Sequence, residues 1–165
     1  MKHKLLLIYS WLIFTLTYFL PDFPFTMKIR GKLYALAMKK SGRNFQVASG
    51  AILRSLENIT VGDDVYIANY VIINAGGEVI IDSQVLIGFR SCIIAGNHTL
   101  KNGSYRFGMS KTKTIQIGFG SWIGCNCSIL AGAIVPASTV IGAGSTVARK
   151  LGEPGKYIGN KLERL

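Results

Sequence analysis

A six-residue period runs through most of the chain and limits its possible folds more than any other feature. Each repeat opens with a β-branched aliphatic residue and carries a small or β-branched residue four places later. The register slips by two residues between Ile73 and Ile81, and it is lost between Ile93 and Ile117. The opening residues are Val61, Ile67, Ile73, Ile81, Ile87, Ile93, Ile117, Ile123, Ile129, Val135 and Ile141.

This period predicts a parallel β-helix. A strand of two or three residues followed by a bend of roughly 120° brings every opening residue onto one interior axis, with three repeats to a coil. An α-helix is excluded because the apolar spacing does not follow a period of 3.6, and a sandwich is excluded because long alternating strands are missing. Glycine often follows the opening residue, and we expect it to supply a positive φ at the bends. These glycines are Gly62, Gly88, Gly118, Gly124 and Gly142.

The first 45 residues have no repeats and differ in composition. Leu5 to Pro21 contains no charged side chain, and its seventeen residues are at the lower limit for crossing a bilayer as a helix. Residues 1–43 contain eight Lys and Arg against Asp22 alone, so they hold +7 of the net charge of +11. From Met27 to Lys40, apolar residues at helical spacing among basic ones predict a membrane-surface helix.

Three interpretations of residues 1–20 remain open: a monotopic or re-entrant membrane anchor, a hydrophobic helix packed in an oligomer, and a cleaved signal peptide. Basic residues on both sides disfavour a simple span, and the stretch from Phe19 to Pro24 makes a poor cleavage site. We expect the basic charge to attract anionic lipid head groups. No nucleic-acid-binding motif accompanies it, so no nucleic acid is expected as a partner.

The repeat is interrupted from Asn97 to Thr114, and such an excursion from a regular solenoid is usually functional. It begins with His98, one of two histidines in the chain. An Arg follows in the loop, then TIQIGFGSWIG at 114–124 and VIGAGSTV at 140–147. The three cysteines, Cys92, Cys125 and Cys127, are expected to be small core or wall residues.

These motifs resemble the hexapeptide-repeat acyltransferase superfamily over about residues 58–160. Within it, the chain is most similar to the maltose, galactoside and nodulation-factor O-acetyltransferases and to capsule and exopolysaccharide acetyltransferases. The resemblance implies a left-handed coil, a homotrimer with active sites between neighbouring prisms, and direct acetyl transfer from acetyl-CoA to a hydroxyl. It places His98 at the catalytic position, as the base that takes the hydroxyl proton.

The resemblance also implies a CoA groove on the C-terminal side of the loop, with small residues against the pantetheine arm and basic residues at the phosphates. Trp122 is expected beside the thioester or, equally, as an anchor of the trimer interface. The alternative for Arg149 and Lys150 is that they are solvent-exposed residues of a bend and bind no ligand. The cofactor residues implied are Trp122, Gly124, Cys125, Ala131, Gly132, Ala143, Arg149 and Lys150. The acceptor residues implied are Asn69, Asn97, Tyr105 and Arg106.

Departures from the family pattern affect two places. Thr99 stands where the family has Pro after the catalytic His. Residues 159–165 read GNKLERL, where the family commonly has Gly-Asn-Pro-Ala-Lys. A metal is not expected, because the related zinc-dependent γ-class carbonic anhydrases need three histidines and only His3 and His98 are present.

The sequence therefore predicts a membrane-associating helical segment over 1–45, a β-helix over 46–151 with an extruded loop at 97–114, and a tail over 152–165. The expected activity is acetyl-CoA-dependent O-acetylation of a cell-surface polysaccharide or its lipid-linked precursor, at the cytoplasmic face of the inner membrane. The alternatives are N-acylation of an amino sugar and a non-catalytic scaffold held at the membrane.

Overall fold

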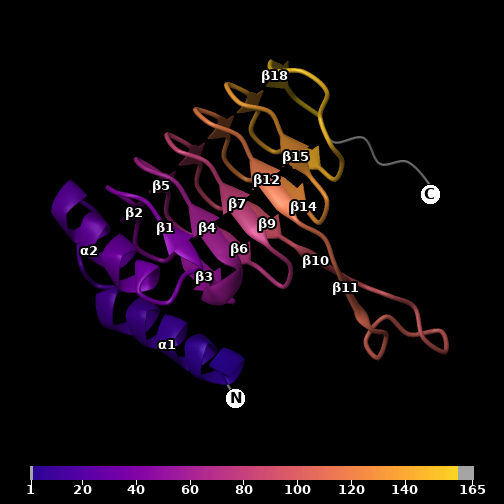
Figure 1. Ribbon diagram of the computed structural model, residues 1–165, viewed down its shortest axis with the longest axis horizontal. Coiled ribbons are helices and arrows are strands. Elements are labelled where there is room, and N and C mark those ends of the chain that lie inside the picture. Colours follow the sequence, from indigo (N-terminus) through magenta and orange to yellow (C-terminus); the bar gives the residue numbers. More distant parts are fainter. Residues whose placement is uncertain (1, 160–165) are drawn as a thin grey trace.

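The computed structural model describes residues 2–159 and consists of two helices followed by a solenoid (Figure 1). Helix α1 covers Lys2–Thr17 and helix α2 covers Pro24–Ala35. The strands that follow stack in parallel into three sheets, A, B and C, of five, six and five strands. The predicted mainly β fold, a parallel β-helix after a helical N-terminal segment, is confirmed.

The strands are short and recur in the order A, B, C. Sheet A contains β1 (Lys40–Ser41), β4 (Ile59–Val61), β7 (Val79–Ile81), β12 (Ile115–Ile117) and β15 (Ile134–Val135). Sheet B contains β2 (Gln46–Val47), β5 (Tyr66–Ile67), β8 (Leu86–Ile87), β13 (Trp122–Ile123), β16 (Val140–Ile141) and β18 (Lys156–Tyr157). Sheet C contains β3 (Ile52–Arg54), β6 (Ile72–Asn74), β9 (Cys92–Ile94), β14 (Ser128–Leu130) and β17 (Thr146–Val147).

The six-residue register predicts the core correctly. Every opening aliphatic residue from Val61 to Ile141 is at most 1% exposed. The residue four places later is buried too, except at Gly77, where the register slips, and at Asn97, where the repeat is interrupted. Two of the polar residues at this second position bond to the next coil: the Ser91 hydroxyl donates to the Gly124 carbonyl at 2.7 Å, and the Ser121 hydroxyl to the Pro136 carbonyl at 2.8 Å. Burying each large aliphatic side chain contributes about 1.5–3 kcal/mol, so the interior column is the main source of stability.

The expected reason for the repeat glycines is wrong. None of Gly62, Gly88, Gly118, Gly124 and Gly142 has a positive φ; that conformation occurs two residues later, for example at Asp64, Arg90 and Gly144. The glycines are required by stacking instead. A Cβ added to Gly62 would lie 2.5 Å from the backbone nitrogen of Ser83, and one added to Gly124 would lie 2.7 Å from that of Ala143.

Helix α2 ends earlier than the sequence predicts. It ends at Ala35 rather than near Lys40, and its buried residues are Thr26, Met27, Arg30, Gly31 and Tyr34. Gly31 decides this orientation, because a Cβ there would lie 1.9 Å from the Phe45 carbonyl oxygen. No helix in residues 2–159 is long and apolar enough to cross a membrane.

The solenoid extends beyond both predicted ends. Strand β1 pairs with β4 through Lys40 and Ser41, before the expected start at residue 46. Strand β18 pairs with β16 through Lys156 and Tyr157, inside the expected tail, of which residues 160–165 lie outside the described part. Two sets of bends are used below: the BC corner, at 68–71, 88–91, 124–127 and 142–145, and the CA corner, at 75–78, 95–114, 131–133 and 148–149.

Candidate active site

The interruption of the repeat forms an arm that projects from the CA corner (Figure 1). Strands β10 (Gly96–His98) and β11 (Ser110–Thr112) pair antiparallel, and the chain between them forms the tip. Two hydrogen bonds to the Met109 carbonyl extend the pairing. The backbone amide of Thr99 donates one at 3.1 Å, and the Thr99 hydroxyl donates the other at 2.9 Å. Leu100, Tyr105 and Phe107 are exposed at the tip.

His98 is the last residue of β10, on the solvent-exposed part of the arm. It stands opposite Ser110, and because Thr99 and Met109 form the adjacent hydrogen-bonded pair, His98 and Ser110 occupy a non-hydrogen-bonded site. Side chains at such a site lie on the same face and close together. Within residues 2–159 the imidazole makes no side-chain hydrogen bond, so both ring nitrogens are available to a ligand.

Ser110 is a candidate that the sequence pattern did not indicate. Residues 83–152 contain no Asp or Glu, so no carboxylate from this stretch can orient the imidazole. Strand pairing places the Ser110 hydroxyl next to His98, which makes Ser110 a candidate for this role. The signal that would have found it is the hairpin register, which the interrupted repeat does not reveal.

The arm separates two neighbouring coils at the CA corner. Thr112 lies against the coil on the N-terminal side, where a Cβ on Gly77 would meet its Cβ at 3.0 Å. Lys113 lies over the coil on the C-terminal side, with its Cδ 3.1 Å from the position of a Cβ on Gly132. Gly132 has a φ of +90°, so a side chain at this position is disfavoured for both conformational and steric reasons.

The CA corner is positively charged. Six Lys and Arg lie in this corner or directly beside it, and the acidic residue of the corner, Glu78, pairs with Lys39. The six are Lys101, Arg106, Lys111, Lys113, Arg149 and Lys150. Arg149 and Lys150 are exposed one coil beyond Gly132. The backbone of Lys150 forms a parallel β-bridge with Ile134 there. Lys113 is therefore a cation near the predicted CoA groove, and the sequence motifs did not indicate it. This corner combines small residues, an exposed imidazole and cations, which suits a polyanionic ligand.

The other predicted cofactor residues lie elsewhere in the chain. Trp122 is half exposed on sheet B, between Leu86 and Val140 on the neighbouring strands. Gly124, Cys125 and Ala143 are at the BC corner, which sheet C separates from the CA corner. Ala131, like Gly132, is at the CA corner. One chain therefore does not bring the predicted cofactor residues into a single site.

The predicted acceptor residues are also divided. Asn97, Tyr105 and Arg106 belong to the arm, and the Arg106 guanidinium lies 5.7 Å from the centroid of the Phe107 ring. Asn69 is at the BC corner, where its amide donates to the carboxylate of Asp22 and to the Ser49 carbonyl. Those bonds hold the segment between α1 and α2, so in this chain Asn69 has a structural role.

The cysteines and histidines do not form a metal site. Within residues 2–159 no group of three or more His, Cys, Asp or Glu residues could hold an ion. Cys127 is buried, and burial raises the pKa of its thiol. His3 is distant from His98 and pairs with Glu57 at 2.6 Å.

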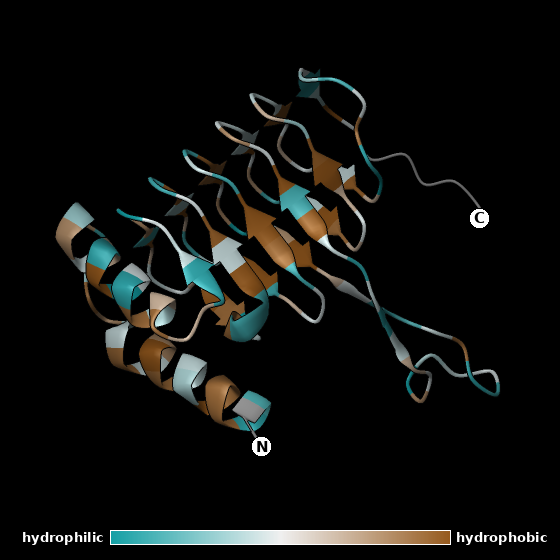
Figure 2. Cartoon of the chain, in the orientation of Figure 1, coloured by the Kyte–Doolittle hydropathy of each residue, from teal (hydrophilic) through white to brown (hydrophobic). Residues whose placement is uncertain are grey.

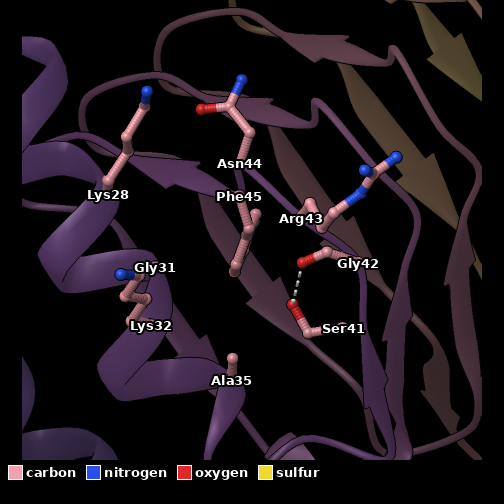
Figure 3. Close-up of a pocket in the computed structure, with 9 residues that line it drawn as sticks. All are labelled: Lys28, Gly31, Lys32, Ala35, Ser41, Gly42, Arg43, Asn44 and Phe45. Atoms are coloured by element: carbon pink, nitrogen blue, oxygen red, sulfur yellow. Dashed lines mark hydrogen bonds between the residues drawn. The ribbon is translucent and has the colours of Figure 1, made fainter.

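Two cavities lie near the helices rather than at the arm. One of about 250 Å³ lies between α2 and the first coil, lined by Lys28, Lys32, Arg43, Asn44 and Phe45 among others (Figure 3). Another of about 790 Å³ lies between α1 and the residues after α2, and includes Leu5, Tyr9 and Leu36. Neither contains a predicted site residue.

The chain is similar in sequence to proteins named as acetyltransferases. It is 31% identical over 103 residues to a protein of Saccharomyces cerevisiae named as a putative acetyltransferase, covering 62% of this chain and 53% of the relative. A similarly named protein of Staphylococcus aureus is 29% identical over 103 residues, covering 62% and 52%. The chain thus spans about half the length of the curated relatives it matches. No family model matches it.

Solved structures decide the fold family. A hexapeptide-repeat acetyltransferase of Vibrio cholerae complexed with acetyl-CoA superimposes with a TM-score of 0.81 at 22% identity, over 94% of this chain and 83% of that one. The chain has the hexapeptide-repeat acetyltransferase fold. A maltose O-acetyltransferase of Clostridium difficile superimposes with a TM-score of 0.82 at 21% identity, over 94% and 82%. A galactoside acetyltransferase in complex with CoA gives 0.81 at 22% identity, over 96% and 78%.

The expected resemblance to hexapeptide-repeat acetyltransferases is therefore confirmed. An N-acyltransferase of Bacillus cereus, bound to dTDP and CoA, has a lower TM-score of 0.59 at 18% identity and covers 78% of this chain and 83% of that one.

Proposed function

We propose that this protein transfers an acetyl group from acetyl-CoA to a hydroxyl of a sugar, with His98 as the general base. The observation that carries the proposal is the position of His98: an exposed imidazole with no side-chain hydrogen bond, on an arm beside a cationic corner of small residues. The likeness to structures complexed with acetyl-CoA and CoA supports the choice of cofactor.

In this mechanism the neutral imidazole accepts the proton of the sugar hydroxyl as its oxygen attacks the thioester carbonyl. The carbon–sulfur bond then breaks, the acetyl group stays on the sugar oxygen, and the imidazolium returns the proton to the CoA thiolate. Ser110, which stands opposite His98 on β11, is proposed to orient the imidazole by a hydrogen bond that its hydroxyl forms in the complex with substrate. Lys113, Arg149 and Lys150 attract the phosphates of CoA.

The site is proposed to form between copies of the chain in a homotrimer. The predicted cofactor residues occupy two corners that sheet C separates, so a site that uses both needs two chains. Outward-facing apolar residues on the sheets that meet at the BC corner offer the contact surface. These are Tyr66, Leu86 and Trp122 on sheet B and Ile72, Ile94 and Leu130 on sheet C.

The acceptor is proposed to be a cell-surface polysaccharide or its lipid-linked precursor. The apolar and basic helical segment supports this acceptor, because it would bring the site to a membrane-bound glycan. N-acylation of an amino sugar is the second candidate, favoured by the likeness to an N-acyltransferase, whose TM-score of 0.59 is lower than those of the O-acetyltransferases.

The test is acetyl-CoA turnover by purified protein, followed as release of the free thiol. His98→Ala is expected to lower turnover by roughly 100-fold or more, as the loss of a general base does. His3→Ala is the matched control and is expected to keep full turnover, because His3 pairs with Glu57 far from the arm. Unchanged turnover in His98→Ala would exclude the mechanism.

Acceptor class is tested by competition between hydroxyl-only sugars and amino sugars in the same assay. Acetyl esters as the product support O-acetylation, and alkali-stable acetamides alone support N-acylation. A non-catalytic scaffold predicts no binding of CoA by calorimetry and no thiol release with either acceptor class.

A further inference from the structure

Helix α1 exposes a continuous apolar surface to solvent. Four residues at helical spacing on α1, together with Phe19 just past its end, are 41–90% exposed, and we name them the α1 stripe: Leu5, Ile8, Leu12, Leu16 and Phe19. Trp11, Phe23 and Phe25 extend the surface and are also exposed. Figure 2 shows the apolar segments recurring along α1 at the end of the molecule. Single exposed apolar residues are ordinary, but a contiguous set of this kind marks an interaction surface.

The opposite face of α1 is already occupied. The Ser10 hydroxyl donates to the Leu53 carbonyl, and Ile13 and Thr17 are buried. The end of the helix is held by Arg30, whose side chain is 2% exposed. Its guanidinium donates to the Thr17 and Leu20 carbonyls and to Asp22, the last at 2.6 Å. The α1 stripe therefore cannot turn inward without breaking this cluster.

The N-terminal helical segment as a whole is positively charged. Lys4, Lys28, Lys32 and Lys40 are exposed and make no ion pair within residues 2–159. Of the acidic side chains of this region, Asp22 pairs with Arg30, and Glu57 contacts His3 at 2.6 Å. Lys28 and Lys32 also border the cavity of about 250 Å³ beside α2, with Asn44 nearby (Figure 3). That cavity offers basic and amide groups to a head-group phosphate.

We propose that the α1 stripe docks on the surface of an anionic lipid bilayer, with α1 lying in the plane of the interface. Sixteen residues make a helix of about 24 Å, which is shorter than the roughly 30 Å of the hydrocarbon core. An exposed apolar face on a helical segment with excess positive charge is typical of an interfacial helix. A second copy fits less well, because it would bring two surfaces of the same positive sign together.

The test uses flotation of the full chain with vesicles of equimolar phosphatidylglycerol and phosphatidylcholine. Wild-type protein is expected to float with these vesicles and to bind vesicles of phosphatidylcholine alone more weakly. Leu12→Gln/Leu16→Gln is expected to reduce binding at least about tenfold, because both side chains are withdrawn from the lipid. Lys28→Gln/Lys32→Gln is expected to reduce binding to the anionic vesicles several-fold.

The matched control is Ile158→Gln, an exposed apolar residue on the last coil at the far end of the solenoid, which is expected to bind as wild type does. The proposal would be overturned if wild-type protein did not bind the anionic vesicles, or if the Leu12→Gln/Leu16→Gln variant bound them as well as wild type does. The proposal would also be overturned if the molar mass of that variant in light scattering fell while its vesicle binding stayed the same. That result would mean that the α1 stripe makes contacts between copies of the chain.

The proposal does not depend on the catalytic one. Flotation needs neither acetyl-CoA nor an acceptor, and turnover of a soluble acceptor does not need vesicles. Loss of flotation with intact turnover refutes docking alone, whereas intact flotation without turnover refutes the proposed activity alone.

Discussion

At the residue scale, glycine serves two different purposes in this coil. The glycine after each interior aliphatic residue lets successive coils stack closely, whereas the residue two places later must adopt a positive φ. Asp64, Arg90 and Asn126 accept that conformation at some bends, and Gly120 and Gly144 at others. Steric contact across coils, rather than backbone freedom, is what excludes other side chains from the first position.

Gly62→Ala is expected to destabilise the solenoid by about 1–3 kcal/mol, because the new Cβ meets the backbone of Ser83, whose carbonyl accepts a hydrogen bond from the Gly120 amide of the next coil. Gly152→Ala is the control and is expected to change stability little, since nothing lies within 4 Å of its added Cβ. Thermal unfolding of both variants measures the difference. Equal midpoints would mean that coil spacing adjusts freely.

At the element scale, a single buried cation joins three parts of the molecule. Arg30 lies on α2, caps the last carbonyls of α1, and donates to the Val47 carbonyl of β2 at 3.2 Å. Its partner Asp22 also accepts from the backbone of Ser49 at 2.8 Å. The orientation of both helices on the first coil therefore depends on this ion pair, which is why α1 presents one fixed face.

Arg30→Met is expected to cost about 3–5 kcal/mol, because it leaves the Asp22 carboxylate and several carbonyls without their partner. Lys28→Met, on the solvent side of the same helix, is the control and should leave stability nearly unchanged. Limited proteolysis reports the effect directly: cleavage between α1 and α2 should become faster in Arg30→Met only. Resistance equal to wild type would show that apolar packing alone holds the helices.

At the scale of the whole molecule, the chain has the shape of a prism with an arm, and its predicted site is divided between two corners. His98, Gly132 and Arg149 are at the CA corner, whereas Cys125 and Ala143 are at the BC corner. An arrangement around a three-fold axis would bring the CA corner of one copy to the BC corner of the next. Catalysis would then depend on assembly.

Mixed assemblies test this dependence. His98→Ala and Ala143→Trp, which places a large side chain in the proposed CoA groove, are each expected to be inactive alone. Co-expressed and purified together, they are expected to recover a measurable part of wild-type turnover, because some interfaces combine an intact His98 with an intact groove. No recovery in assemblies shown to contain both chains would place the whole site within one chain.

The sequence by itself determined the period, the interior residues, the parallel β-helix and the position of the arm. Those features depend on local spacing. An aliphatic residue every six places must lie on one axis once the chain bends regularly, and a segment without that spacing, such as the one that starts at Asn97, must leave the axis. The family resemblance then directed attention to His98, and its location on an exposed arm agrees with that expectation.

Only the tertiary structure decided what depends on contacts between distant residues. The stacking of Gly62 on Ser83, the burial of Arg30, and the pairing of His98 with Ser110 join positions that no local pattern relates. It also showed that Asn69 is engaged by Asp22. A repeat specifies where a side chain lies within its coil, but the neighbour of that side chain comes from another coil, a helix or the returning strand of the arm. Close packing between these elements therefore determines which residues can act together.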